Sequence, residues 1–131
     1  MPIPLKVSDE TAAEGITTET VLFFPKKIVT VAELIEQKVK SEVEKYNQTM
    51  DGHYDGLVQP LESEKKIRGF SLKLGQIIDL EKQQEAAIQA FSKNGFFLFV
   101  NDQQVLDLNL EISIDSKTSV NFIRLVPLVG G

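Results

Sequence analysis

Cysteine and tryptophan are absent from this 131-residue chain, and histidine occurs once. The absence of cysteine excludes a disulfide, a thiolate zinc site and a thiol nucleophile, and it is consistent with a reducing compartment. Arginine is scarce too, with only Arg68 and Arg124, and the formal net charge is −5. Because phosphate binding needs clustered lysine and arginine, this balance argues against nucleic acid as a partner.

Long apolar runs are also missing. No stretch approaches the ~18 apolar residues that a membrane-spanning helix requires, so we expect no membrane partner. The first residues, MPIPLKVSDE, have neither the basic segment nor the apolar core of a secretory signal. With 42% hydrophobic and 25% charged residues, the composition is that of an ordinary globular domain. The sequence therefore predicts a cytoplasmic protein with a single core.

No catalytic or metal-binding motif stands out. The patterns GxGxxG, GK[ST] and HExxH are absent. His53 lies within DGHYDG, between Asp51 and Asp55, but a calcium loop needs a different oxygen spacing and zinc needs three or four ligands. We expect an exposed turn there, with no metal. The acidic runs ESEKK and DLEKQQE are typical of solvated faces, so we expect no catalytic residue, no bound cofactor and no enzymatic activity.

The first half of the chain predicts a β-hairpin followed by a long helix. Residues 3–7 and 16–24 have strand-like patterns, with the polar stretch SDETAAEG as a loose connection between them. Pro25 ends the second strand because it has no N–H to donate. Thr30 and Glu33 have the spacing of a capping box. Apolar residues then recur at helical spacing, which predicts a helix over about 31–46.

The second half predicts further strands and a shorter helix. Residues 48–66 are polar and rich in turns, and GFSLKLG predicts a short strand in which Phe70, Leu72 and Leu74 alternate. Asp79 is a candidate N-cap for a second helix, which Asn94-Gly95 would end in a left-handed conformation.

Three strand signals follow the second helix. FFLFV, residues 96–100, is apolar throughout, as expected of a central strand covered on both faces. NDQQVLD predicts a hairpin turn into a short strand. A last strand is predicted from Val120 to Val126, ended by Pro127.

This order of elements is typical of an α+β protein with the β-grasp fold, in which a mixed sheet wraps one long helix. The last strand then commonly lies beside the first. We expect a domain over 1–126, with an insertion at about 48–95 that contains a strand and the second helix. Residues 127–131 would form an exposed, extended tail, because Pro127 cannot extend a ladder and ordering Gly130-Gly131 costs much entropy.

The segment KTSVNFIRLVPLVGG resembles the end of ubiquitin-like proteins, in which a last strand leads to Gly-Gly. Together with VTVAELIEQKVKSEVEKYN and NGFFLFVNDQQVLDL, it resembles a family of bacterial ubiquitin-like proteins. The insertion is longer than the corresponding segment of ubiquitin, and Val126–Val129 stand where ubiquitin places arginines. An apolar approach to Gly-Gly is also similar to sulfur carriers, so a conjugated modifier and a sulfur carrier both remain open.

The resemblance implies a function for the tail. Gly131 would be adenylated by an activating enzyme that uses ATP and Mg²⁺, passed to partner cysteines as a thioester, and joined to a target protein by a conjugating enzyme, in a bacterial ubiquitination-like pathway. A deconjugating protease is a possible further partner. Gly130 would let the backbone enter a narrow channel, and Pro127, Leu128 and Val129 would bind partners by strand addition. The alternatives are a sulfur carrier that forms a C-terminal thiocarboxylate and a non-conjugated β-grasp interaction module with an inert tail.

Overall fold

The computed structural model describes residues 1–11, 13–66 and 69–125. Within these ranges the chain is a mixed α+β protein with two helices, α1 (Val31–Thr49) and α2 (Leu80–Ser92). Its strands are β1 (Ile3–Thr11), β2 (Gly15–Phe24), β3 (Ile28–Thr30), β4 (His53–Tyr54), β5 (Glu64–Lys65), β6 (Phe70–Ser71), β7 (Phe96–Val100), β8 (Gln103–Gln104), β9 (Glu111–Ser113) and β10 (Val120–Arg124). Neither described helix is long and apolar enough to cross a bilayer.

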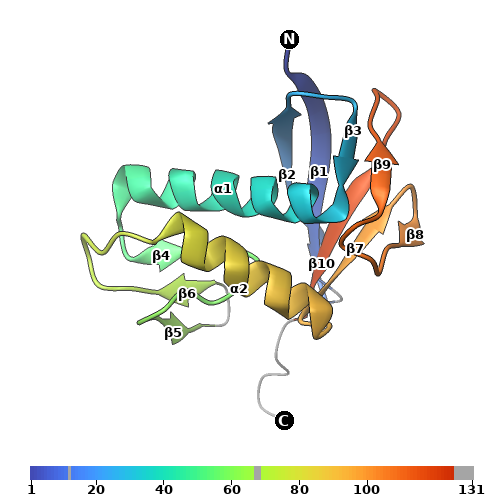
Figure 1. Cartoon of the computed structure of the whole chain (residues 1–131). Helices are drawn as coiled ribbons and strands as arrows, with labels where there is room; N and C mark the ends of the chain where they lie inside the picture. The colour runs from blue at the N-terminus through green and yellow to red at the C-terminus, as the bar shows by residue number, and fades with distance from the viewer. Residues whose placement is uncertain (12, 67–68, 126–131) are drawn as a thin grey trace.

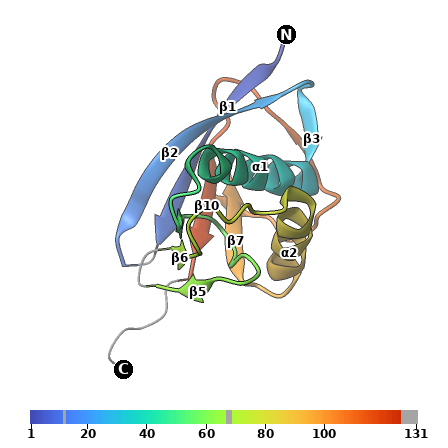
Figure 2. The ribbon, with the colours of Figure 1, turned by 90° about the vertical axis from the view of Figure 1, so that its left-hand side faces the viewer.

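The largest sheet has five strands in the order β2-β1-β10-β7-β8. β1 is parallel to β10, and every other neighbouring pair is antiparallel. The last strand of the described chain is therefore central, between the first strand and β7. Both helices lie on one face of this sheet (Figure 1), and the sheet curves around α1 (Figure 2).

The segment between α1 and β7 forms a three-stranded sheet, β4-β6-β5, followed by α2. Side-chain amides hold this segment to the rest of the molecule. Asn47 on α1 donates to the Ile78 carbonyl at 3.1 Å and accepts from the Ile78 N–H at 3.0 Å. Gln84 on α2 donates to the Glu36 carbonyl of α1 at 3.0 Å. These bonds satisfy polar groups at the junction and fix α2 beside α1.

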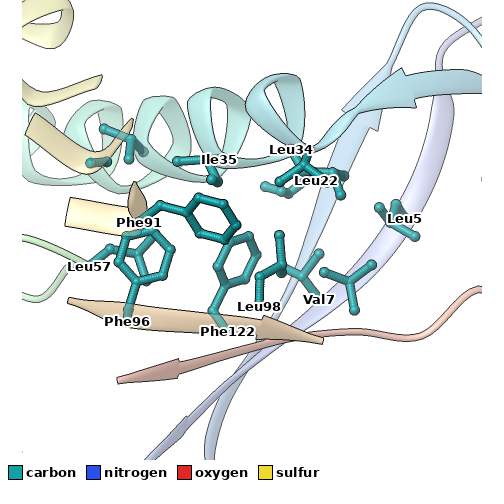
Figure 3. Close-up of a cluster of buried hydrophobic side chains, with 14 of the residues drawn as sticks. Leu5, Val7, Leu22, Leu34, Ile35, Leu57, Phe91, Phe96, Leu98 and Phe122 are labelled. Carbon is teal, nitrogen blue, oxygen red and sulfur yellow. The ribbon is translucent and has the colours of Figure 1, made fainter. Parts of the chain in front are cut away.

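The core lies between the helices and the inner face of the five-stranded sheet (Figure 3). Most of its fully buried members come from the five-stranded sheet and from α1, and others are Val29 on β3, Tyr54 on β4 and Ala87 on α2. The ring centres of Phe91 on α2 and Phe96 on β7 lie 5.9 Å apart. The labelled side chains of this cluster are Leu5, Val7, Leu22, Leu34, Ile35, Leu57, Phe91, Phe96, Leu98 and Phe122. Because these side chains leave the aqueous phase together, their burial holds α1 at a fixed position over β1 and β10.

The predicted helix starts are confirmed. Thr30 Oγ1 accepts from the Glu33 N–H at 3.1 Å, and the Thr30 N–H donates to Glu33 Oε1 at 3.1 Å, which completes the capping box. Asp79 caps α2 by accepting from the Lys82 N–H at 3.1 Å. The first helix extends beyond the predicted residue 46 to Thr49, and Asn94 adopts the predicted left-handed conformation with φ 60°.

The predicted β1–β2 hairpin is confirmed, but its connection is shorter than the predicted SDETAAEG, because β1 continues to Thr11 and β2 begins at Gly15. This polar part of β1 pairs with β2 on one side and β10 on the other, so its backbone groups are satisfied in the ladder. The alternation of strand side chains also places Asp9 and Thr11 on the same face as Leu5 and Val7. All four are buried, so two polar residues form part of the inner face.

Three other expectations are corrected. The strand predicted over GFSLKLG is limited to Phe70–Ser71, and Leu74 is 81% exposed, because the chain turns at Gly75 with φ 80°. In β7, Phe96, Leu98 and Val100 are buried, but Phe97 and Phe99 on the other face are only half-buried, so this strand is fully covered on one face and partly covered on the other. His53 is exposed as expected, but it lies in β4 rather than in a turn.

Candidate functional site

The inner face of the sheet changes from apolar to polar toward the end of β10. Along β1, the buried side chains on the inner face are, in order, Leu5, Val7, Asp9 and Thr11. In the parallel pairing, Thr11 lies opposite Arg124, the last residue of β10. Two strands that supply the core, β1 and β10, therefore also place polar groups at the same end of the sheet, the buried Thr11 and the half-buried Arg124.

Lys38 on α1 covers this polar end. Its Nζ lies 3.0 Å from Asp9 Oδ2 and 2.8 Å from Glu42 Oε2, and its side chain is only 4% exposed. The ammonium also lies 5.7 Å from the centre of the Phe122 ring. A buried charge is tolerated only when it is paired and hydrogen-bonded, and Lys38 meets this condition with two carboxylates from different elements.

The environment shifts the titration of these groups. Burial lowers the pKa of Lys38, but the charges of Glu42 and Asp9 outweigh it and hold that pKa above its usual value. Burial raises the pKa of Glu42, and this effect exceeds the opposing effect of Lys38. Burial, together with the Glu42 carboxylate, raises the pKa of Tyr54 well above its usual range. The ammonium of Lys38 and the neutral phenol of Tyr54 are thus the favoured forms.

Glu42 connects this cluster to the segment after β4. Its Oε1 accepts from the Leu57 N–H at 3.2 Å and from the Tyr54 hydroxyl at 3.4 Å. Both carboxylate oxygens are therefore occupied, because Oε2 contacts Lys38. The carboxylate holds the β4 segment against α1.

Arg124 fixes the end of β10 to the same segment. Its Nη1 donates to Asp55 Oδ1 at 2.6 Å and to the Gly56 carbonyl at 3.2 Å. Burial lowers the pKa of the guanidinium, but the hydrogen bond and charge of Asp55 outweigh this and raise it. Leu125, the next residue, is 56% exposed. The position where the described chain leaves the sheet is therefore set by an ion pair to Asp55.

A cavity of about 220 Å³ adjoins this exit. Arg124 and Leu125 line it together with residues from the β1–β2 connection and from the β4–β6 segment, including Thr11, Thr17, Lys65 and Phe70. Its wall combines hydroxyl groups, basic and acidic side chains and one aromatic ring.

The residues that the sequence predicted as functional, Pro127, Leu128, Val129, Gly130 and Gly131, lie outside the described residues, as does Val126 of the predicted last strand. The structure places the strand that precedes them, β10, at the centre of the sheet.

The sequence reasoning missed the Lys38 cluster and the Arg124 anchor. The sequence did contain a signal for the Lys38 cluster. Asp9 continues the inward alternation of Leu5 and Val7, and Lys38 follows Leu34 by one helical turn on the buried face of α1. The partner of Arg124 had no such signal, because Asp55 is 69 residues away in the chain.

Within the described ranges, no three histidine, aspartate or glutamate side chains are grouped so that they could hold a metal ion. Comparison of the chain with protein-family models, with curated proteins and with solved structures gave no match.

Proposed function

We propose that this chain is a ubiquitin-like protein modifier with a β-grasp fold, whose C-terminal glycine is activated and conjugated to a target protein. The observation that carries the proposal is the position of β10. This strand is central and parallel to β1, and it ends at Arg124. The next residue, Leu125, is exposed, and the sequence then continues as VPLVGG. A strand so placed is held on both sides, so it can support a reactive end without being displaced.

The topology supports the β-grasp assignment. A hairpin, β1–β2, is followed by α1, and the sheet order β2-β1-β10-β7-β8 surrounds the inner face on which this helix packs. The segment with β4, β5, β6 and α2 is then an insertion between the helix and the third large strand. It adds a second layer beside α1 and leaves the order of the main sheet intact.

The proposed chemistry belongs to Gly131 and to partner enzymes. A carboxylate oxygen of Gly131 attacks the α-phosphate of Mg-ATP on the activating enzyme, giving an acyl-adenylate and pyrophosphate. A partner thiolate attacks the acyl carbon and releases AMP, which forms a thioester. An amine or hydroxyl of the target, delivered with the conjugating enzyme, then displaces the thiol and gives the amide or ester. The chain itself contributes no cysteine.

The test is ATP-dependent conjugation. The chain with an N-terminal affinity tag is incubated with an extract of its source organism, Mg²⁺ and ATP, and covalent products are separated under denaturing conditions. We expect larger species that require ATP and that are lost when Gly130-Gly131 is deleted or when Gly131→Ala is introduced, because a misplacement of about 1 Å at the reacting carbonyl costs large rate factors. Leu106→Ala, which truncates a side chain that is 73% exposed in the segment after β8, is the control and should behave as the wild type.

The alternatives give different results in the same system. For a sulfur carrier, the intact chain gains the mass of one oxygen-to-sulfur exchange and no target-linked species forms. The apolar residues from Val126 to Val129 are the feature that favours this reading. For an inert tail on an interaction module, the deletion variant retains its partners and neither product appears. An undiminished covalent product from the deletion variant would refute the proposal.

A further inference from the structure

β2 lies at one margin of the five-stranded sheet, beside α1 (Figure 2). In the described part of the chain it pairs with β1 alone. The N–H and C=O groups of an antiparallel strand point alternately to its two sides, so those on the side away from β1 have no partner among the described strands. An edge of this kind can accept a further strand.

β2 has few of the features with which proteins block such an edge, namely a short strand, lysine, proline or a bulge. It is 10 residues long, contains no lysine or proline, and pairs with β1 in an unbroken register from Thr18 to Phe24. Val21 and Phe23 are 48% and 55% exposed, and alternation places them on the face opposite the buried Leu22, away from the helices. The second half of β2 thus offers both backbone groups and apolar side chains to a partner.

A groove of about 290 Å³ lies between this edge and α1. It is lined by Val21–Phe23 of β2 and, on α1, by two glutamines together with Lys40, Ser41, Glu44 and Lys45. Both lysines are exposed, and Lys40 Nζ lies 4.0 Å from Glu44 Oε1. The groove therefore carries more positive than negative charge, whereas the chain as a whole has a net charge of −5. An acidic side chain is the complement of this helix wall.

A strand added to β2 would direct its side chains alternately to the groove and to the opposite face of the sheet. The side chains directed to the groove meet Lys40 and Lys45, which favour carboxylates. The side chains directed to the opposite face lie beside Val21 and Phe23, where apolar cross-strand pairs are favourable. We propose that the free edge of β2 binds an extended segment of a partner protein in which acidic and apolar residues alternate.

A second copy of this chain is a poorer occupant of the same edge. The charged residue of β2, Glu19, lies on the face away from the helices, and its Oε2 is 2.8 Å from Lys6 Nζ. In a β2–β2 pair, the side chains directed to the helix side would be those of Thr20, Leu22 and Phe24, none of which is acidic. A second copy therefore lacks the charge that complements the groove, and the expected partner is a different protein.

The probe is a synthetic peptide of about seven residues, a usual length for a strand, in which glutamate and valine alternate. Three related peptides serve as controls. One has lysine in place of glutamate, one has the same residues grouped into a glutamate block and a valine block, and one has N-methylated backbone amides that cannot donate to β2. Binding is measured from amide chemical shifts of the ¹⁵N-labelled full chain at neutral pH, and amide hydrogen exchange in β2 reports new backbone hydrogen bonds.

We expect the alternating acidic peptide to shift the amides of Leu22, Phe23 and Ser41 and to slow hydrogen exchange in β2. Each related peptide should bind more weakly, because it lacks the negative charge, the alternation or the backbone donors. Lys45→Glu should weaken binding of the acidic peptide about fivefold, the factor that corresponds to the loss of an exposed ion pair. Lys82→Glu makes the same change at an exposed position on α2, outside the groove, and should bind as the wild type does.

The proposal is overturned if the acidic peptide causes no shifts, if any of the related peptides binds as tightly, or if Lys45→Glu binds as tightly as the wild type. It is also overturned if sedimentation of the chain alone shows a dimer in which the β2 amides are already protected, since a second copy would then occupy the edge. The inference is independent of the proposed function. Deletion of Gly130-Gly131 should leave peptide binding unchanged even though it abolishes conjugation.

Discussion

Two lysines on α1 show that the contribution of an ion pair to stability depends on the burial of its residues. Lys38 is buried between two carboxylates, whereas Lys40, two positions later, is 48% exposed in its side chain and lies 4.0 Å from Glu44. Both belong to ion pairs with a glutamate four residues further along the helix. Only the first is removed from water, so only there does each partner depend on the other to offset its desolvation.

We predict that Lys38→Met lowers the free energy of unfolding by about 3–5 kcal/mol, because it leaves Asp9 and Glu42 buried without their cation. Lys40→Met, which removes the same charge from the surface, should change it by less than about 1 kcal/mol. Urea unfolding followed by circular dichroism measures both values. Equal decreases in the free energy of unfolding would show that burial does not strengthen the dependence of Asp9 and Glu42 on Lys38.

At the scale of elements, local signals determine where the helices begin. The capping box at Thr30 satisfies two backbone N–H groups within four residues, so no distant contact is needed to start α1. The strands depend on their neighbours instead. The polar residues 8–11 form part of β1 because β2 and β10 flank them, whereas the apolar alternation at 70–74 yields only two strand residues.

Thr30→Ala should lower the free energy of unfolding by about 1 kcal/mol, because the Glu33 N–H loses its side-chain acceptor at the start of α1. Glu33→Gln retains an acceptor at the same position and should cost less. Chemical denaturation of the two variants against the wild type gives the comparison. A loss from Glu33→Gln as large as that from Thr30→Ala would contradict the role assigned to the threonine side chain.

The buried titratable groups act on the whole molecule through linkage. The pKa of Tyr54 in the folded state is raised above its ordinary value of 10.0, and that of Lys38 above 10.5. Above about pH 10 the folded state therefore binds more protons than the unfolded state, and stability falls as the pH rises. Below the unfolded-state pKa values, the contribution of both groups is fully present.

We predict that the free energy of unfolding decreases as the pH rises above 10, by up to about 1.4 kcal/mol per pH unit for each group. Tyr54→Phe keeps the ring that packs against Tyr46 at 5.9 Å and removes the phenol, so the decrease should be less steep. Urea unfolding at a series of alkaline pH values measures the slope. Parallel slopes for the variant and the wild type would refute a contribution from Tyr54.

Patterns in the sequence were enough to predict the local features of this protein. The helices follow from apolar spacing and from the caps Thr30 and Asp79, and the β1–β2 hairpin follows from alternation ended by Pro25. These features depend on residues a few positions apart, so a pattern in the chain is enough to predict them. The resemblance of the ending to ubiquitin-like proteins is likewise carried by a short contiguous segment.

The burial of polar residues and the contacts between distant groups depend on the packing of the whole fold and not on a local pattern. Asp9 lies in a polar stretch and becomes part of the inner face because β10 pairs beside it. Arg124 contacts Asp55, which is 69 residues away in the chain. A charged side chain has no intrinsic preference for a buried position. Its place depends on whether folding brings it a partner that offsets the loss of water, and that partner is set by the packing of α1 and the β4 segment against the sheet.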